Sequence, residues 1–149
     1  MEPLDLLFID VADPAYEGEC ALRFRILREP LGFTRADVAF PFEAESLHLV
    51  AVDADGVVRG CVLFHPDGRG GGRLFQMAVD EALQGQGVGR ALVDHLEAEL
   101  AERGIEEVEL HARDHAIGFY ARLGYVAFGE PYTEVGIPHQ NMRKRLSSG

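Results

Sequence analysis

The most regular hydrophobic pattern lies in the third quarter of the chain. Apolar residues recur there every four positions, at Val88, Leu92, Leu96 and Leu100. This spacing places them on one face of an amphipathic helix, which we expect to span 88–103 and to cover a core with that face. Gly104 follows directly, and glycine is common just after a helix end because it adopts a positive φ without strain.

Runs rich in β-branched and aromatic residues precede this helix and predict three consecutive antiparallel strands at 47–52, 57–64 and 73–79. Residues 53–56 are Asp-Ala-Asp-Gly, and an Asp-Gly pair between two such runs favours a hairpin. A second, glycine-rich turn at 66–72 connects the last two strands. We therefore expect an antiparallel sheet ahead of the helix.

The remaining segments complete the predicted order. We expect strands at 6–11, 105–111, 125–128 and 141–146, a helix at 16–28 stopped by Pro30 and Gly32, and a helix capped by Asp114 and closed by Gly124. The order is β-α-β-β-β-α-β-α-β-β, with 33–42 unassigned. It predicts an α+β (mixed α/β) fold, in which a mostly antiparallel sheet of about six or seven strands is flanked by helices and is parallel only across helix 88–103.

Composition narrows the class of protein. The chain has 149 residues, 47% apolar and 26% charged, which is typical of one globular domain spanning 1–149. No apolar run approaches the roughly 20 residues of a membrane helix, and the acidic start lacks a basic export signal, so we expect a cytoplasmic protein without a membrane partner. A net charge of -11 without a basic stripe argues against nucleic acid. Cys20 and Cys61 stand alone, and His111 and His115 lack a third ligand, so no metal is expected.

A glycine-rich segment, Gln84-Gly85-Gln86-Gly87-Val88-Gly89-Arg90, lies between strand 73–79 and helix 88–103. Glycines let the backbone turn tightly and let a ligand approach its N–H groups. The first N–H groups of a helix have no intrahelical partner, and the helix dipole adds about half a positive charge there. Arg90 is the only charged side chain between Gln84 and Leu92, so this turn suits a phosphate group.

Two other phosphate-binding motifs do not fit this segment. A P-loop requires a lysine, and the segment contains none. A dinucleotide fingerprint would place its third glycine at Arg90 or Leu92, and it would follow the first strand of the fold. A glycine-rich turn without a ligand remains an alternative.

Two motifs stand in register on the predicted elements. Gln84-x-x-Gly87-x-Gly89 matches the Q/R-x-x-G-x-G/A signature of the GNAT superfamily of acetyl-coenzyme A (acetyl-CoA) dependent N-acyltransferases, and 116–125 resembles its A-x-x-F-Y-x-x-x-G-F/Y segment. The tail, 134–142, resembles the E-x-G-I-P-H-x-x-M ending of a bacterial subset. The predicted order of elements also matches the GNAT fold, so the resemblance covers nearly the whole chain.

The resemblance implies acetyl-CoA as co-substrate and an amine as acceptor. The pantetheine arm would pair with the backbone of Met77, Ala78 and Val79, and an N–H near Val79 would polarise the thioester carbonyl. The pyrophosphate would be held by the backbone amides of Gln84, Gly85, Gln86, Gly87, Val88, Gly89 and Arg90. Tyr120 would contact the thioester and act as the acid for the leaving thiolate, although a tyrosine at this spacing also fits core packing.

The general base is the open question. Many relatives place a carboxylate on the strand before the glycine loop, but 73–79 contains no Asp or Glu. His111, at a strand end facing the presumed cleft, then Glu134 and His139 are the remaining candidates, alongside water-mediated proton loss. Structural roles are the alternative for each: a hydrogen bond at a strand end for His111, and turn formation for the other two. Arg113 stands where many relatives carry an asparagine that contacts the cofactor.

We therefore expect an N-acetyltransferase in which an amine, on a small molecule or a protein, attacks the acetyl group directly in a ternary complex. The missing carboxylate keeps a second hypothesis open, a non-catalytic acetyl-CoA-binding or CoA-binding regulatory module, and a scaffold without a ligand is the third. The negative surface would attract a cationic amine but does not identify it. A homodimer, common in this fold, also remains open.

Overall fold

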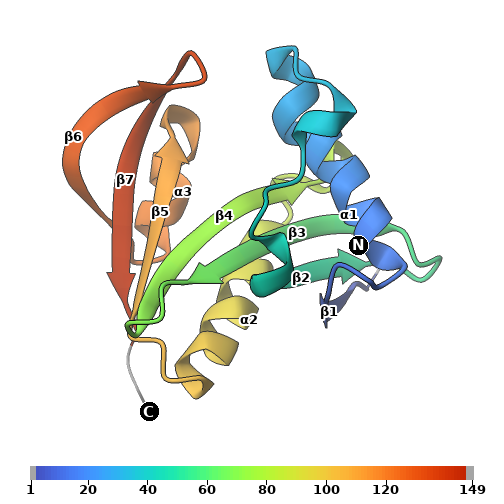
Figure 1. Cartoon of the computed structure of the whole chain (residues 1–149), viewed down its shortest axis with the longest axis horizontal. Helices are drawn as coiled ribbons and strands as arrows, with labels where there is room; N and C mark the ends of the chain where they lie inside the picture. Colours follow the sequence, from blue (N-terminus) through green and yellow to red (C-terminus); the bar gives the residue numbers. More distant parts are fainter. Residues whose placement is uncertain (1–2, 147–149) are drawn as a thin grey trace.

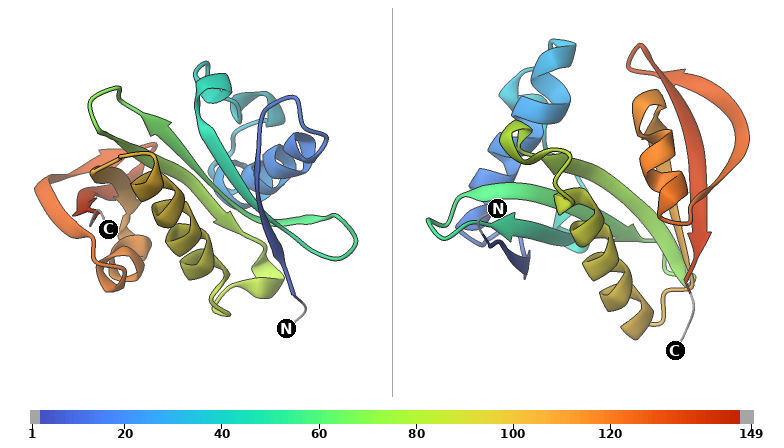
Figure 2. Two further views of the ribbon diagram at one scale, coloured as in Figure 1. Left: turned by 90° about the horizontal axis from the view of Figure 1, so that it is seen from below. Right: turned by 180° about the vertical axis from the view of Figure 1, so that it is seen from behind.

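The computed structural model describes residues 3–146 and contains one seven-stranded sheet with helices packed on both faces (Figures 1 and 2). The strands are β1 (Asp5–Ile9), β2 (Leu47–Val52), β3 (Val58–Pro66), β4 (Gly71–Val79), β5 (Glu107–Arg113), β6 (Val126–Glu134) and β7 (Ile137–Arg145). The helices are α1 (Ala15–Arg23), α2 (Val88–Glu102) and α3 (Ile117–Arg122), and a π-helical turn, Phe24–Arg28, continues α1. Short 3₁₀ turns lie at Glu29–Leu31, Arg35–Asp37, Glu43–Glu45, Glu81–Leu83 and Asp114–Ala116. Within residues 3–146, no helix has the length and apolar character needed to cross a membrane.

The strands follow the order β1-β2-β3-β4-β5-β7-β6, and every neighbouring pair is antiparallel except β4 and β5. The predicted succession of strands and helices and the mixed α+β class are confirmed. The single parallel pair follows from the connection, because α2 carries the chain back to the same end of the sheet before β5 begins. The turn at 53–56 forms the predicted hairpin, with Gly56 at φ 80°.

The predicted apolar face of α2 is the centre of the larger core. Val88, Leu92, Leu96 and Leu100 are all buried. They pack against one face of the sheet, and a Cβ on Gly60 of β3 would lie only 3.1 Å from Leu92 Cδ1. On the other face, α1 covers a smaller cluster that includes Val50 and Ala78. The sheet is therefore buried on both sides in its centre.

Two predictions near the N-terminus were wrong in their bounds. The helix expected over 16–28 ends at Arg23, because the backbone widens into the π-helical turn in which Glu29 N–H bonds to Phe24 C=O. One turn of π-helix presents nearly the same hydrophobic pattern as α-helix, so the sequence does not separate them. The first strand is Asp5–Ile9, not 6–11, because Asp10 accepts a hydrogen bond from the N–H of Ala12 and begins a turn.

The last two strands are longer than 125–128 and 141–146. β6 and β7 pair from Val126 opposite Arg143 to Glu134 opposite Ile137. Gly129 and Pro131 lie within β6, where the register shift between Phe128 and Tyr132 makes a bulge. Because β6 is an edge strand, a proline is tolerated in it.

Asp114 does not cap the final helix as predicted. It begins a 3₁₀ turn, and α3 starts three residues later with Ala116 at its N-cap and no side-chain cap. Asp114 therefore belongs to the turn that connects β5 to α3, and not to the N-terminus of the helix.

β4 and β5 pair over a short distance and then separate. Their rungs run only from Gly71 opposite Glu107 to Arg73 opposite Glu109. Beyond them β4 stays with β3 while β5 stays with β7, so the two strands diverge (Figure 1). β4 also carries a bulge, with Gln76 at φ 53°, which bends it. The last part of β4 therefore has one edge that no other described strand occupies, and we call this opening the splay.

Candidate active site

The glycine loop forms the N-terminal end of α2. Gly85 and Gly87 have φ values of 80° and 88°, and a Cβ on either would meet no atom within 4 Å. Gly87 is the N-cap residue of α2, whose first turn carries no acidic side chain. The N–H groups of residues 88–90 have no acceptor within the helix. The loop therefore presents free donors and the positive end of the helix dipole to open space, as a phosphate site requires.

Gln84 fixes this loop to the end of β4. Its side-chain amide donates to the carbonyl oxygen of Val79 at 2.9 Å. On the opposite edge, Asp80 N–H donates to the carbonyl oxygen of Arg59 at 2.8 Å. Successive N–H groups alternate between the two edges of a strand, so those of Val79 and Met77 point into the splay. The free edge of β4 and the glycine loop are thus continuous.

The second sequence motif packs against the first. A Cβ on Gly89 would lie 3.2 Å from Phe119 Cζ, so this glycine allows α2 and α3 to approach. Tyr120 is buried, and its ring meets those of Phe119 and Tyr125 edge-on at centroid distances of 5.0 and 5.7 Å. Burial raises the pKa of Tyr120. The ring therefore packs in the core, and the hydroxyl stays protonated at neutral pH, as an acid must.

The three candidate bases lie together in space, although β5, β6 and β7 contribute one each. Glu134 Oε1 lies 3.8 Å from His111 Nδ1, and Glu134 Oε2 lies 3.7 Å from His139 Nε2. The ring of Tyr132 is edge-on to His111 and stacked on His139. We call His111, Glu134 and His139 the histidine cluster. The order β5-β7-β6, which the sequence did not reveal, brings them together.

Within this cluster, His111 is the group best suited to accept a proton. Burial lowers its pKa, and the charge of Arg73 adds to this, while Glu134 opposes it. His111 Nδ1 is buried and has no hydrogen-bond partner among residues 3–146. His139 instead directs Nδ1 at the carbonyl oxygen of Ile137, at 2.8 Å, which fixes the proton on that nitrogen. The side chain of His111 is 23% exposed and that of His139 only 4%, so substrate has better access to His111.

Tyr120 and His111 lie on opposite faces of the sheet. Val108, Leu110 and Ala112 of β5 are buried in the same core cluster as Tyr120. Side chains alternate between the two faces of a strand, so His111 belongs to the other face. The two side chains therefore lie on either side of the sheet beside β5.

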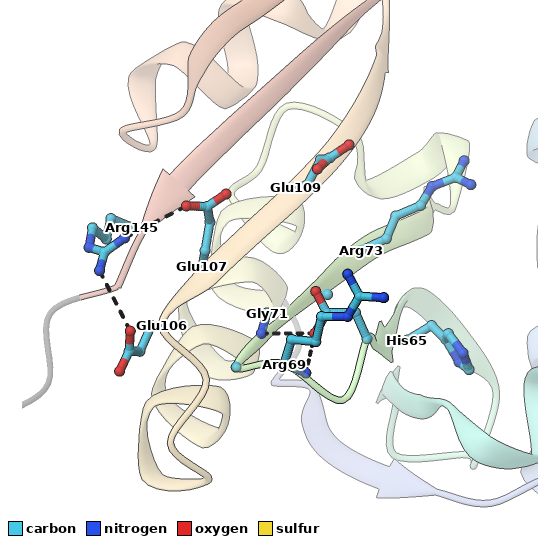
Figure 3. A pocket seen from close by; sticks show the side chains of 11 residues that line it. His65, Arg69, Gly71, Arg73, Glu106, Glu107, Glu109 and Arg145 are labelled. Carbon is cyan, nitrogen blue, oxygen red and sulfur yellow. Dashed lines mark hydrogen bonds and ion pairs between the residues drawn. The ribbon is translucent and has the colours of Figure 1, made fainter.

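A cavity of about 450 Å³ lies at the closed end of the splay (Figure 3). Arg73 and Glu109, the last paired rung, contribute to its lining. At its base Arg145 lies 3.6 Å from Glu106 and 3.8 Å from Glu107. The cavity is on the same face as the histidine cluster and at the other end of β4 from the glycine loop. These lining residues were not predicted, although the polar residues that alternate along 107–113 mark one face of β5.

A second group of titratable residues, Glu19, Glu43 and His48, is buried under α1 and has ligand atoms within 4.8 Å of one another. Arg23 occupies the space between the carboxylates, donating to Glu19 at 2.9 Å and to Glu43 at 2.7 Å. His48 Nδ1 lies 3.0 Å from Glu19, and its Nε2 lies 2.8 Å from the carbonyl oxygen of Glu43. Although burial alone would lower the pKa of His48, these acceptors raise it. The group is an ion-pair network rather than a candidate metal centre.

The chain is similar to known acetyltransferases over most of its length. A family described as an acetyltransferase (GNAT) domain matches residues 33–146. YitI of Bacillus subtilis (strain 168), an uncharacterized N-acetyltransferase, is 32% identical over 135 residues, which cover 87% of this chain and 90% of YitI.

Solved structures extend the similarity to the fold. The crystal structure of a protein from Lactobacillus plantarum, named as an N-acetyltransferase, is 27% identical with a TM-score of 0.85, covering 98% of this chain and 100% of that one. An aminoglycoside 6'-N-acetyltransferase complexed with coenzyme A has a TM-score of 0.80 at 20% identity, covering 96% and 97% of the two chains. The latter match supports the fold alone.

Proposed function

Because the chain belongs to the GNAT family of acetyltransferases, and is therefore an acyltransferase, we propose that it transfers an acetyl group from acetyl-CoA to an amine by direct attack in a ternary complex. One observation carries the proposal: the glycine loop at the start of α2 adjoins the free edge of β4 at the splay. The proposal includes a cytoplasmic location, which agrees with two buried free cysteines.

The residues present fit acetyl-CoA. Backbone N–H groups of the loop, from Gln84 to Arg90, would hold the pyrophosphate without any lysine. The free edge of β4, at Met77, Ala78 and Val79, would accept the pantetheine arm as an added strand. The Val79 N–H, which points into the splay, is the donor we assign to the thioester carbonyl, a role that typically contributes about 10²–10³-fold to rate.

Acetyl-CoA supplies an activated acyl thioester, and residues of this chain accept one proton and donate another. The neutral amine forms a C–N bond at the acetyl carbon while the C–S bond breaks. His111 takes the proton that the amine loses, and Glu134 beside it stabilises the imidazolium that results. Tyr120 donates its proton to the departing sulfur and recovers one from solvent. Because an alkyl amine has a pKa of about 10, only about one molecule in a thousand is neutral at pH 7. A base positioned to remove the proton therefore lowers the free-energy barrier of the reaction.

Turnover is the direct test of this proposal. The purified protein is incubated with acetyl-CoA and a panel of small amines and peptides, and free thiol is measured. We expect thiol release that depends on the amine. Thermal stabilisation by CoA without turnover of any amine would instead support the non-catalytic module, and no stabilisation at all would support a scaffold without a ligand.

Replacing Gly87 with Asp is expected to weaken acetyl-CoA binding about 10- to 100-fold relative to Gly87→Asn. The two substitutions have the same shape and meet the same open space at φ 88°, so they differ only in charge. A carboxylate at the N-cap of α2 repels the pyrophosphate, whereas the uncharged amide of the same shape does not. Calorimetry at two salt concentrations measures this difference, which should narrow at high salt. Equal affinities for the two variants would show that the pyrophosphate does not bind at this helix end.

The pH dependence of the reaction should identify the base. Because Glu134 raises the pKa of His111 while burial and Arg73 lower it, Glu134→Gln should move the acidic limb of kcat/KM to lower pH. In His111→Gln that limb should disappear and leave only the limb that the pKa of the acceptor amine sets, since kcat/KM reports the essential base of the free enzyme beside the ionisation of the free substrate. Glu130→Gln, an exposed glutamate on the same strand, is the control and should leave the limb in place. An enzyme limb that survives in His111→Gln, at a pH below the pKa of the acceptor amine, would assign the base elsewhere.

A further inference from the structure

Two arginines in this acidic chain lack the ion pairs that the other buried cations have. Within residues 3–146, eight basic side chains lie within ion-pair distance of a carboxylate, namely Arg23, Arg25, Arg35, Arg59, Arg90, Arg103, Lys144 and Arg145. Four others are exposed to solvent, namely Arg69, Arg73, Arg122 and Arg143. Among the residues that the structure describes, only Arg28 and Arg113 are half-buried without such a partner. With 25 acidic residues against 14 basic ones, a shortage of carboxylates does not explain this.

Arg28 is held in place by its surroundings. It ends the π-helical turn after α1, and its guanidinium lies over the rings of Phe33 and Phe40 at 5.3 and 5.7 Å. Its Nε is buried and has no hydrogen-bond partner among the described residues. A guanidinium fixed between aromatic rings with an unused buried donor is prepared to bind an acceptor that the chain itself does not provide.

Arg113 brings a second guanidinium to the same place. It lies at the end of β5, and its Nη2 donates to the carbonyl oxygen of Leu27 at 3.1 Å, the residue just before Arg28. This bond crosses from β5 to the π-helical turn, on the far side of the splay. Burial lowers the pKa of Arg113, and the charge of Arg28 lowers it further. Two desolvated like charges so close to each other are unfavourable unless an anion lies between them.

The spacing to the histidine cluster suits one small molecule. Arg113 lies two positions from His111 on β5, so both side chains are on the same face with Cα atoms about 7 Å apart. The negative charge of Glu134 acts to raise the pKa of both guanidiniums, but Glu134 is within 4 Å of neither. Its carboxylate lies within 4 Å of the two histidines instead. Positive groups are therefore at one end of this face, and a carboxylate with a neutral base is at the other.

We propose that the acceptor is an amine that also carries a carboxylate, which Arg28 and Arg113 bind while Glu134 and His111 receive the amino group. This inference rests on the proposed acetyl transfer. It replaces the expectation of a cationic amine that the negative net charge suggests, because the site holds two guanidiniums as well as a carboxylate. An amino acid carries a carboxylate and an amine on one small molecule, which matches a face with cations at one end and a carboxylate at the other.

The test compares matched acceptors on the intact enzyme. Each amino acid of a panel is assayed against its own carboxamide, which keeps the amine and side chain and removes the negative charge. The carboxamide has the lower amine pKa, so intrinsic reactivity alone favours it. We expect the amino acid to have a kcat/KM at least 10-fold higher for the best side chain.

Variants then locate the effect. Arg28→Gln and Arg113→Gln should each reduce the preference for acid over amide about 10-fold or more, mainly through KM for the amino acid. The dissociation constant of acetyl-CoA should stay the same. Arg122→Gln, an exposed arginine on α3, is the matched control and should retain the preference. If Arg28→Gln does not fold, Arg28→Lys keeps the charge but not the planar fork, and the comparison in the unmodified enzyme needs no variant.

The outcomes separate this inference from the proposal it rests on. Acetyl transfer with equal or better use of the carboxamides would overturn the carboxylate site and leave acetyl transfer intact. A preference for acids that survives in both arginine variants would also overturn it. The absence of transfer to every amine would overturn the proposed function, and this inference with it.

Discussion

Replacing Tyr120 with Phe is expected to lower kcat about 10²-fold or more while the affinity for acetyl-CoA stays nearly unchanged. General acid catalysis typically contributes about 10²–10⁴-fold, and the substitution removes only the hydroxyl. The ring, which packs edge-on between Phe119 and Tyr125, keeps its place. Steady-state kinetics together with a direct binding measurement distinguish loss of the chemical step from loss of binding.

Tyr125→Phe provides the matched control. Tyr125 is buried in the same aromatic cluster, but its hydroxyl donates to Glu97 at 2.8 Å and lies outside the proposed machinery. Its loss should cost about 1 kcal/mol of stability and leave kcat intact. Equal kcat values for Tyr120→Phe and the parent enzyme would assign Tyr120 to core packing alone, the other interpretation that its spacing allowed.

Replacing Arg23 with Met is expected to reduce the free energy of unfolding by about 3–5 kcal/mol, because it leaves buried carboxylates without their cation. Arg23 and Glu19 are fully buried, and Glu43 nearly so. Burial alone would lower the pKa of Arg23, but the bonds from it to Glu43 and the charge of Glu19 raise it. Denaturant unfolding followed by circular dichroism measures the change.

Arg25→Met is the control for this effect. Arg25 belongs to the same helical segment and lies 3.2 Å from both Asp80 and Glu81, but its side chain is 43% exposed. An exposed pair contributes only about 0–1 kcal/mol, so this variant should unfold almost like the parent. If the two variants lost similar free energies of unfolding, burial would not be the reason for the contribution of the Arg23 network to stability.

The Arg23 network also reaches the proposed site. Arg23 Nε donates to Gln76 Oε1 at 3.2 Å, and Gln76 forms the bulge that bends β4 at the splay. The guanidinium holds this side chain from the face of the sheet that α1 covers, so a buried charge far away in sequence contacts the residue at which β4 bends. This hydrogen bond links α1 to the strand that lines the splay.

Patterns with a short range predicted the fold well. The α2 face, its glycine end and the 53–56 hairpin follow from spacing and turn chemistry, which act between residues near each other in the chain. The predictions were wrong where two structures share one hydrophobic pattern, as in the π-helical turn at Phe24–Arg28. They were also wrong where strand pairing overrides the conformational preference of a single residue. Gly129 and Pro131 indicate a loop on their own, but a bulge in an edge strand accommodates both.

The same division applies to the site. The sequence by itself determined the glycine loop and the start of α2, because helix ends and positive φ are local properties, and it singled out Tyr120, His111, Glu134 and His139 as residue types capable of the chemistry. Only the tertiary structure decided that the two histidines flank Glu134 and that Arg28 and Arg113 lie together. Strand order and the divergence of β4 from β5 set those contacts, and they arise from packing between segments that no local pattern connects.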